Sequence, residues 1–362
     1  MRVCSAKVRE LRRVGVLRAL GSGREGKLHM AGGSASPHQE LAPFLLEPLF
    51  VSRVWGYRDL RPWYDYVVEE PKSEPVGEVW LTGDECAVGS GPHAGEKLGD
   101  VFAAAPDAML GAGAPSPQSP LLVKMIFARE KLSVQVHPDD RLAQKYGQPR
   151  GKTECWYALA ADEGAQVAAG LKPGVTPDQV RTGIERGSLE ESLNILPVKR
   201  GDMVFVDAGT VHAIWPGSIL LETQQNSDIT YRMYDYGRPR ELHVEKSLQA
   251  MRFETRAGLV PPRIEEDRTI LIDVEYFRVE RIAVKGLRES ATLPGEGEAP
   301  GGLSYLFTAD GSARLAGSGF GALVLPPRGI AAIPAASPAF TMEDLGGLDL
   351  IRISPRWPRK PL

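Results

Sequence analysis

Two histidines and one glutamate stand where they could bind a metal ion. His137 lies on the polar face of the alternating segment Leu132–His137, two residues after Gln135. Because successive side chains of a strand point to opposite faces, Gln135 and His137 would project together. Glu154 opens a second strand-like segment, and His212 follows a predicted tight turn. Two imidazoles, a carboxylate and an amide oxygen suit Zn²⁺ with one open coordination position, and they also admit Fe²⁺, Mn²⁺ or Co²⁺.

A histidine on a strand is more often a packed or hydrogen-bonded residue than a ligand, so spacing alone leaves the metal site open. The segment Gly201–His212 (GDMVFVDAGTVH) favours it, because its glycine and histidine spacing resembles the second cupin motif, with Asp207 where that motif usually has proline. The first cupin motif is altered: Gln135 replaces its first histidine, and sixteen residues separate His137 from Glu154.

Short apolar stretches cut by glycine and proline must position these residues. The chain has 39 Gly and 29 Pro, which favours many short strands over long helices. Strands are predicted near the candidate site at Val76–Leu81, Leu121–Phe127, Leu132–His137, Cys155–Leu159, Asp202–Val206, Ala213–Trp215 and Ile219–Gln224. Short helices are predicted at 98–110, 139–147, from Thr176 to about residue 194, and at His243–Met251.

Composition excludes several classes of protein. The net charge of −3 gives no reason to expect a nucleic-acid partner. No apolar stretch approaches the roughly 18–20 residues that span a bilayer. The cysteines, Cys4, Cys86 and Cys155, are odd in number and far apart, which argues against disulfides and for a reducing compartment. We therefore expect a cytoplasmic protein with no membrane association, no nucleic-acid partner and no evident protein partner.

Three parts are expected along the chain. Residues 1–40 are basic, with a net charge of +6 over the first thirty, and we expect a disordered extension. This extension is either a targeting peptide or a stretch upstream of a true start at Met30. Residues 41–258 contain the candidate site and form a catalytic domain with helical insertions. Residues 259–362 contain no histidine or cysteine and are expected to form a second β domain without metal chemistry.

Four segments carry a long and specific pattern: Lys124–Asp140 (KMIFAREKLSVQVHPDD), Gly151–Tyr157 (GKTECWY), Gly209–Ile214 (GTVHAI) and Gln224–His243 (QQNSDITYRMYDYGRPRELH). Their order and spacing resemble type I phosphomannose isomerases of the cupin superfamily, in the short bacterial form. The resemblance extends from about Pro43 to the end of the chain and is strongest over 120–250. It implies a mainly β fold of two cupin-like jelly-roll barrels, with a few short helices inserted around the catalytic barrel.

The resemblance also implies an activity: zinc-dependent interconversion of mannose 6-phosphate and fructose 6-phosphate through a cis-enediol. It implies one Zn²⁺ per chain, a catalytic arginine at Arg232, and metal ligands at Gln135, His137, Glu154 and His212. Such a reaction moves a proton between C2 and C1, so negative charge must be stabilised beside a carbonyl. A Lewis-acid metal and a permanently charged arginine both do this. Without the resemblance, a structural ion pair of Arg232 with Asp235 or Asp228 would be preferred.

The sequence does not identify the general base or the phosphate site. Candidates for the base are Lys152, if burial lowers its pKa, a metal-bound water, Glu222 and Asp235. No phosphate loop of the Walker type is present. Ser133, on the strand face of Gln135 and His137, and Lys124, one strand earlier, are the candidates for the phosphate site, although a buried serine or a lysine lying along apolar surface is commoner.

A non-catalytic cupin that binds a sugar or regulates another process is the alternative class. The set of four metal ligands with Arg232 discriminates, because a binding relic would be free to lose it, and all five residues are present. An oxygenase-type cupin would keep two histidines in its first motif and lack the segment around Arg232. We therefore predict a sugar-phosphate isomerase.

Overall fold

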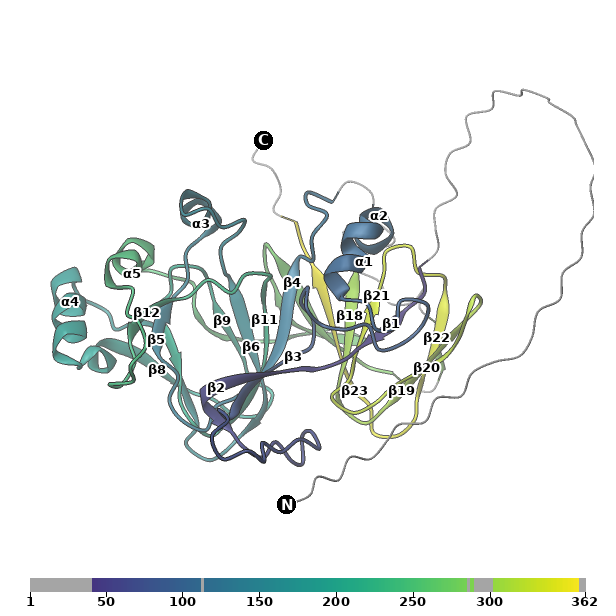
Figure 1. Cartoon of the computed structure of the whole chain (residues 1–362), viewed down its shortest axis with the longest axis horizontal. Helices are drawn as coiled ribbons and strands as arrows, with labels where there is room; N and C mark the ends of the chain where they lie inside the picture. Colours follow the sequence, from purple (N-terminus) through teal and green to yellow (C-terminus); the bar gives the residue numbers. More distant parts are fainter. Residues whose placement is uncertain (1–40, 112–113, 285–286, 290–301, 358–362) are drawn as a thin grey trace, which may run out of the picture. The chain divides into compact units, whose positions relative to one another are not determined.

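The structure is a computed structural model that describes residues 41–111, 114–284, 287–289 and 302–357. The basic extension at 1–40 lies outside the described residues. Strands dominate and the helices are short (Figure 1), which confirms the predicted mainly β fold. Among the described residues no helix is long and apolar enough to span a membrane.

The first barrel consists of two antiparallel sheets. Sheet I, as far as it is described, contains in spatial order β13 (Gly258–Val260), β9 (Met203–Val206), β6 (Glu154–Ala161), β11 (Ser218–Gln225), β4 (Leu121–Phe127), β3 (Val76–Trp80) and β2 (Leu49–Tyr57). Sheet II, within the same limits, contains β12 (Tyr231–Tyr234), β5 (Val134–Val136), β10 (His212–Ile214), β7 (Gln166–Leu171) and β8 (Leu193–Pro197).

The second barrel also has two antiparallel sheets. Sheet III contains, among the described residues, β1 (Phe44–Leu46), β21 (Ile330–Ile333), β18 (Ser304–Asp310), β23 (Asp349–Pro355), β16 (Phe277–Ile282), β15 (Arg268–Asp273) and β14 (Arg263–Ile264). Sheet IV contains β17 (Leu287–Glu289), β22 (Phe340–Asp344), β19 (Ala313–Gly317) and β20 (Phe320–Leu325). Strand β1 comes from the start of the described chain yet pairs with β21, so the segment before the first barrel is part of the second barrel's sheet. The division at residues 258 and 259 stays a prediction.

Short helices connect the strands of the first barrel. They are α1 (Leu98–Ala104), α2 (Pro106–Leu110), α3 (Asp140–Lys145), α4 (Pro177–Arg186), the 3₁₀ helix η1 (Leu189–Ser192) and α5 (Val244–Ala250). Thr176 caps α4 in a capping box, as its sequence predicts. The predicted continuation of this helix to about residue 194 is wrong. Gly187 ends α4 in the left-handed region at φ 69°, and the chain then forms η1 and β8.

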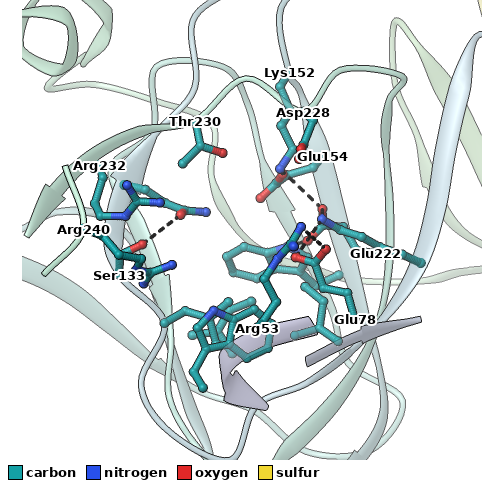
Figure 2. Close-up of a pocket in the computed structure, with 17 residues that line it drawn as sticks. Arg53, Glu78, Ser133, Lys152, Glu154, Glu222, Asp228, Thr230, Arg232 and Arg240 are labelled. Atoms are coloured by element: carbon teal, nitrogen blue, oxygen red, sulfur yellow. Dashed lines mark hydrogen bonds and ion pairs between the residues drawn. The ribbon is translucent and has the colours of Figure 1, made fainter. Parts of the chain in front are cut away.

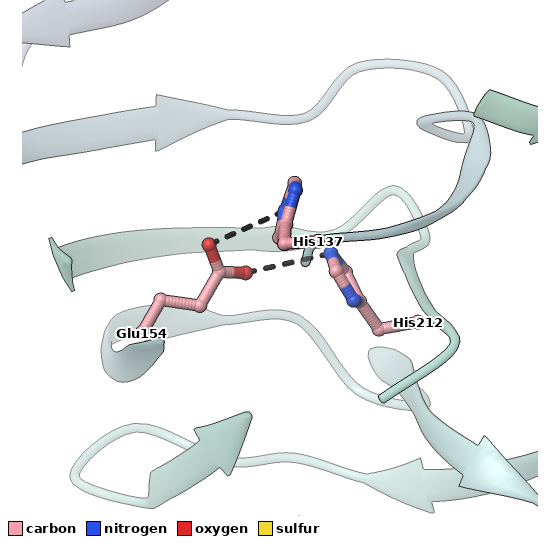
Figure 3. Close-up of side chains that lie close together, drawn as sticks. All are labelled: His137, Glu154 and His212. Atoms are coloured by element: carbon pink, nitrogen blue, oxygen red, sulfur yellow. Dashed lines mark ion pairs between the residues drawn. The ribbon is translucent and has the colours of Figure 1, made fainter. Parts of the chain in front are cut away.

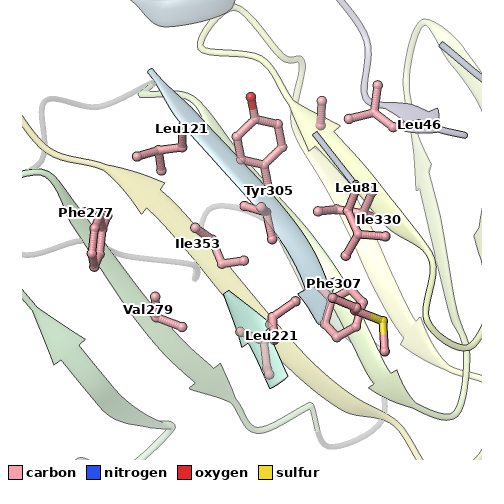
Figure 4. Packing of buried hydrophobic residues seen from close by; sticks show 14 of the residues in the cluster. Leu46, Leu81, Leu121, Leu221, Phe277, Val279, Tyr305, Phe307, Ile330 and Ile353 are labelled. Carbon is pink, nitrogen blue, oxygen red and sulfur yellow. The ribbon is translucent and has the colours of Figure 1, made fainter. Parts of the chain in front are cut away.

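Alternation along the strands separates the interior of the first barrel from its outside. Odd-numbered residues of β4, such as Val123 and Met125, pack against apolar side chains of sheet III, including Tyr305 and Phe307. Figure 4 shows this shared core with Leu121 and Leu221 of sheet I among residues of sheet III. Even-numbered residues of β4 therefore point into the barrel, which is where Lys124 lies.

Candidate active site

Cross-strand pairing places the predicted site residues on facing walls inside the first barrel. In sheet II, His212 of β10 and Arg232 of β12 both pair with Gln135 of β5. In sheet I, Glu222 of β11 pairs with Lys124 of β4, and Gln224, two residues later, pairs with Glu154 of β6. Residues paired in this way have Cβ atoms about 4.5–5.5 Å apart. Positions far apart in sequence thus line one cavity.

The cavity has a volume of about 360 Å³, and its wall is strongly charged. Its charged and hydroxyl lining residues, shown in Figure 2 with others that line it, are Arg53, Glu78, Lys124, Ser133, Lys152, Glu154, Glu222, Asp228, Thr230, Arg232 and Arg240. The lining of the cavity also includes apolar side chains, among them Trp55, Trp156 and Ile126. The volume and the density of charge suit a small, highly polar ligand.

Three of the four predicted metal ligands converge beside this cavity. His137 Nε2 lies 3.5 Å from Glu154 Oε2, and His212 Nε2 lies 3.4 Å from Glu154 Oε1 (Figure 3). One ligand atom from each residue lies within 4.8 Å of the others, and all three side chains are 1% exposed. Such a buried cluster of two imidazoles and one carboxylate has the ligand chemistry of a transition-metal or zinc site.

Backbone carbonyls hold both imidazoles with Nε2 facing the glutamate. His137 donates its Nδ1–H to the carbonyl oxygen of Ile229 at 2.7 Å, and His212 donates its Nδ1–H to that of Thr210 at 2.9 Å. Each Nε2 is then left with a lone pair, as a metal ligand requires. Burial lowers the pKa of His137 well below its usual value and that of His212 to about 4. At neutral pH both rings are therefore uncharged.

One orphaned atom shows that the residues fit a cation. His137 Nε2 is buried and accepts no hydrogen bond from any described residue, although a glutamate oxygen faces it. Two acceptors that face each other in a dry site are unfavourable unless a cation lies between them. Gln135 presents its amide nitrogen to His212 Nε2 at 3.2 Å, while its Oε1 accepts from the Ser133 hydroxyl. Rotating this amide by half a turn would present the oxygen instead.

Two close contacts between loops position Lys152 and His137. The backbone N–H of Lys152 donates to Pro138 O at 3.1 Å, and that of Gly209 donates to His137 O at 2.9 Å. A Cβ on Gly151 would lie 2.5 Å from Pro138 O, so only glycine allows this approach. Asp207 stands where the second cupin motif usually has proline. Its carboxylate accepts a hydrogen bond from the Thr210 hydroxyl at 2.9 Å, which stabilises the turn.

A chain of alternating charges extends across sheet I from Glu154, beside His137 and His212. Lys152 Nζ lies 2.9 Å from Glu154 Oε2 and 3.5 Å from Glu222 Oε1. Lys124 Nζ lies 3.1 Å from the same Glu222 oxygen and 3.4 Å from Glu78 Oε1. Arg53 completes the chain at 2.8 Å from Glu78. The two lysines are 4% exposed, so each is a buried cation that two carboxylates enclose.

The network predicts how stability depends on pH. Burial by itself raises the pKa of Glu78, but the nearby charges of Lys124 and Arg53 outweigh this effect. Together they lower the pKa from 4.5 to about 2. The unfolded chain therefore takes up this proton at a higher pH than the folded protein. The stabilisation is complete above about pH 4.5 and is lost as the pH falls toward 2.

We expect Glu78→Gln to remove this part of the pH dependence. The difference in the free energy of unfolding between wild type and variant should shrink by up to about 3 kcal/mol as the pH falls from 5 to 2. Urea denaturation at several pH values measures it. A difference that does not change with pH would contradict the assignment.

Arg232 approaches the cavity from sheet II and is held by its own segment. Its Nη1 donates to Glu241 O at 2.8 Å, and its Nε lies 4.0 Å from Asp235. The ion pair with Asp235 that the sequence suggested is therefore long. Asp235 is 2% exposed, also contacts Arg238 and Arg240, and does not line the cavity. This position does not favour Asp235 as a base in contact with a ligand.

All eight predicted site residues lie in or beside the cavity, and several further residues line it. Arg53, Glu78, Thr230 and Arg240 also line the cavity and are not among the residues that the sequence predicted. Glu78 could have been found, because it is a lone carboxylate inside an otherwise apolar predicted strand. Arg240 carried no such signal, since it lies in an irregular segment where arginine is common.

Comparison with known proteins agrees with this geometry. Residues 44–169 match the family described as phosphomannose isomerase type I, catalytic domain. A mannose-6-phosphate isomerase of Streptococcus mutans is 35% identical over 260 residues, which are 67% of this chain and 80% of that protein. The ManA mannose-6-phosphate isomerase of Bacillus subtilis is 35% identical over 259 residues, with the same coverage.

Solved structures give the same result for the fold. The crystal structure of the mannose 6-phosphate isomerase from Bacillus subtilis matches with a TM-score of 0.74 and 30% identity, covering 86% of this chain and 99% of that one. A protein of Archaeoglobus fulgidus described as a putative mannosephosphate isomerase has a TM-score of 0.68 at 20% identity and covers 88% and 100%, so that likeness concerns the fold alone. The chain belongs to the type I phosphomannose isomerase family.

Proposed function

We propose that the protein is a zinc-dependent aldose–ketose isomerase that interconverts mannose 6-phosphate and fructose 6-phosphate through a cis-enediol. The observation that supports this most is the buried His137, Glu154 and His212 cluster, with an orphaned imidazole nitrogen, beside a charged cavity. Curated relatives at 34–35% identity are named mannose-6-phosphate isomerases, and they include Bacillus subtilis proteins.

The residues present would hold one Zn²⁺ through His137, His212 and Glu154, with the Gln135 amide oxygen as a fourth ligand after rotation. A bound zinc ion supplies Lewis-acid stabilisation of negative charge that develops on the substrate oxygens. Arg232 lies one strand from Gln135 and presents a permanent positive charge to the same cavity. A fixed guanidinium there stabilises the enediolate without exchanging a proton itself.

We assign proton transfer between C2 and C1 to Lys152, which is an ammonium at rest and acts once it has lost one proton: its neutral amine takes the proton from C2, and the ammonium that forms returns it to C1. Its Nζ lies 2.9 Å from Glu154 and therefore beside the atoms that would hold the metal. Glu222 contacts the Lys152 and Lys124 ammonium groups and holds both side chains toward the cavity. Trp156 donates its indole N–H to Glu222 at 3.1 Å, which fixes the carboxylate in turn. Lys152→Met should lower turnover without changing the content of bound zinc.

Removing the metal tests the proposal directly. We expect the purified protein to convert mannose 6-phosphate to fructose 6-phosphate and to lose this activity after treatment with a chelator. Added Zn²⁺ should restore it at one ion per chain, as measured by metal analysis beside a coupled assay. Activity that persists in demonstrably metal-free protein would overturn zinc dependence. Preference for another aldose phosphate would overturn the substrate and leave the chemistry unchanged.

A further inference from the structure

The cations that line the cavity differ in how their charge is balanced. Lys124, Lys152 and Arg53 lie in the chain of charges on the side of sheet I, and each contacts at least one carboxylate that also lines the cavity. A phosphate group at Lys124 would meet Glu78 and Glu222 at the same place. Like charges in a buried site repel each other strongly, so this wall suits the sugar end of a ligand better than its phosphate.

On the opposite side of the cavity, two arginines line the wall, and the carboxylate that balances their charge lies outside the lining. We call Ser133, Arg232 and Arg240 the arginine wall; Figure 2 shows these three across the cavity from Glu154 and Glu222. Their counter-ion Asp235 is buried and does not line the cavity. The arginine wall therefore presents positive charge and a hydroxyl to a ligand.

Arg240 is held in a geometry that leaves one edge of its guanidinium available. Its Nε and Nη2 donate to the two oxygens of Asp235 at 2.6 and 2.7 Å, a bidentate pair. Its Nη1 makes no hydrogen bond to any described residue, and its side chain is 25% exposed. A guanidinium fixed in this way loses little conformational entropy when it binds an anion.

We infer that Arg240 is the residue that selects a phosphorylated sugar, binding the phosphate together with Ser133 while the sugar carbons lie toward the metal ligands. This inference rests on the proposed function and names the specificity residue of that site. Arg232 borders both the phosphate and the sugar. Lys124 instead serves to hold Glu222 and Glu78.

Arg240→Ala and Arg238→Ala form a matched pair that tests the inference. Both variants remove an arginine that contacts Asp235, but Arg238 does not line the cavity and pairs with Glu130 at 2.9 Å. We expect Arg240→Ala to raise KM for mannose 6-phosphate about 10- to 100-fold, as loss of a charge-assisted hydrogen bond would, with little change in kcat or zinc content. Arg238→Ala should leave KM nearly unchanged, and Arg240→Lys should give an intermediate KM.

Unphosphorylated mannose and inorganic phosphate each lack one half of the proposed substrate. They therefore separate recognition of the phosphate from the isomerisation reaction. With unphosphorylated mannose at high concentration, wild type and Arg240→Ala should have equal kcat/KM. Equal KM increases in the Arg240 and Arg238 variants, or a loss confined to kcat, would overturn the inference.

Calorimetric titration with inorganic phosphate keeps the inference separate from the proposed function. If the wild-type protein shows no isomerase activity, the proposed function fails, but phosphate binding that is lost only in Arg240→Ala still supports an anion site at the arginine wall. Equal phosphate binding in wild type and Arg240→Ala overturns it, whatever the enzyme activity.

Discussion

Replacing His137 by alanine is expected to abolish the proposed zinc binding and to lower kcat/KM for mannose 6-phosphate by at least about 10³-fold, because Lewis-acid stabilisation is worth several kcal/mol. The side chain is 1% exposed, and among the described residues the cluster that could hold the metal consists of His137, Glu154 and His212, so its loss leaves two of these three ligands. Metal analysis and steady-state kinetics on the same preparation measure both effects.

A second variant and a control distinguish loss of the metal from misfolding of the protein. Glu154→Gln keeps the shape of the side chain while removing the charge that faces both imidazoles, and we expect it to lose zinc as well. His93→Ala makes the same kind of change at a histidine that contacts Glu96 outside the cavity, and it should keep full activity. Full turnover by His137→Ala or Glu154→Gln would rule out this metal centre.

Arg232→Ala is expected to lower kcat about 10²- to 10³-fold while the zinc content stays at the wild-type value, because this loss removes charge stabilisation only. Arg232 pairs with Gln135 across the sheet but is not part of the His137, Glu154 and His212 cluster. Arg232→Lys keeps the charge and loses the planar fork, so its kcat should lie between those of wild type and the alanine variant.

The measurement that decides the role of Arg232 is metal content beside kcat. A variant that loses zinc together with activity would show a structural arginine, the role that its own segment suggested without the family resemblance. Unchanged kcat would equally contradict a part in catalysis. Circular dichroism before each assay excludes unfolding as the cause.

Much of the fold could be predicted from local sequence. The strand over Leu121–Phe127 agrees with β4 at both ends, because a run of apolar residues bounded by loop residues suits a strand buried on both faces. The helix N-caps at Thr176 and Asp139 could also be predicted from local sequence, because each side chain accepts a hydrogen bond from the backbone N–H three residues later. Helix α4 ended earlier than predicted because Gly187 adopts a left-handed conformation.

Pairing between distant strands could not be predicted in the same way. Strand β1 joins a sheet whose neighbouring strand β21 lies almost 290 residues later, and no local pattern specifies such a partner. The apolar run of β4 predicted a strand buried on both faces. It did not reveal that one face would pack on sheet III while the other, with Lys124, would line the cavity.

The sequence by itself determined which residue types were available for the chemistry: the candidate ligands His137, Glu154 and His212, and the arginine at position 232. Their motifs are local and specific, so the family could be expected before any coordinates. Only the tertiary structure decided how each charge is balanced, because an ion pair depends on distances across sheets that sequence separation does not encode. It enclosed Lys124 between two carboxylates and left Arg240 facing the cavity with its counter-ion behind it.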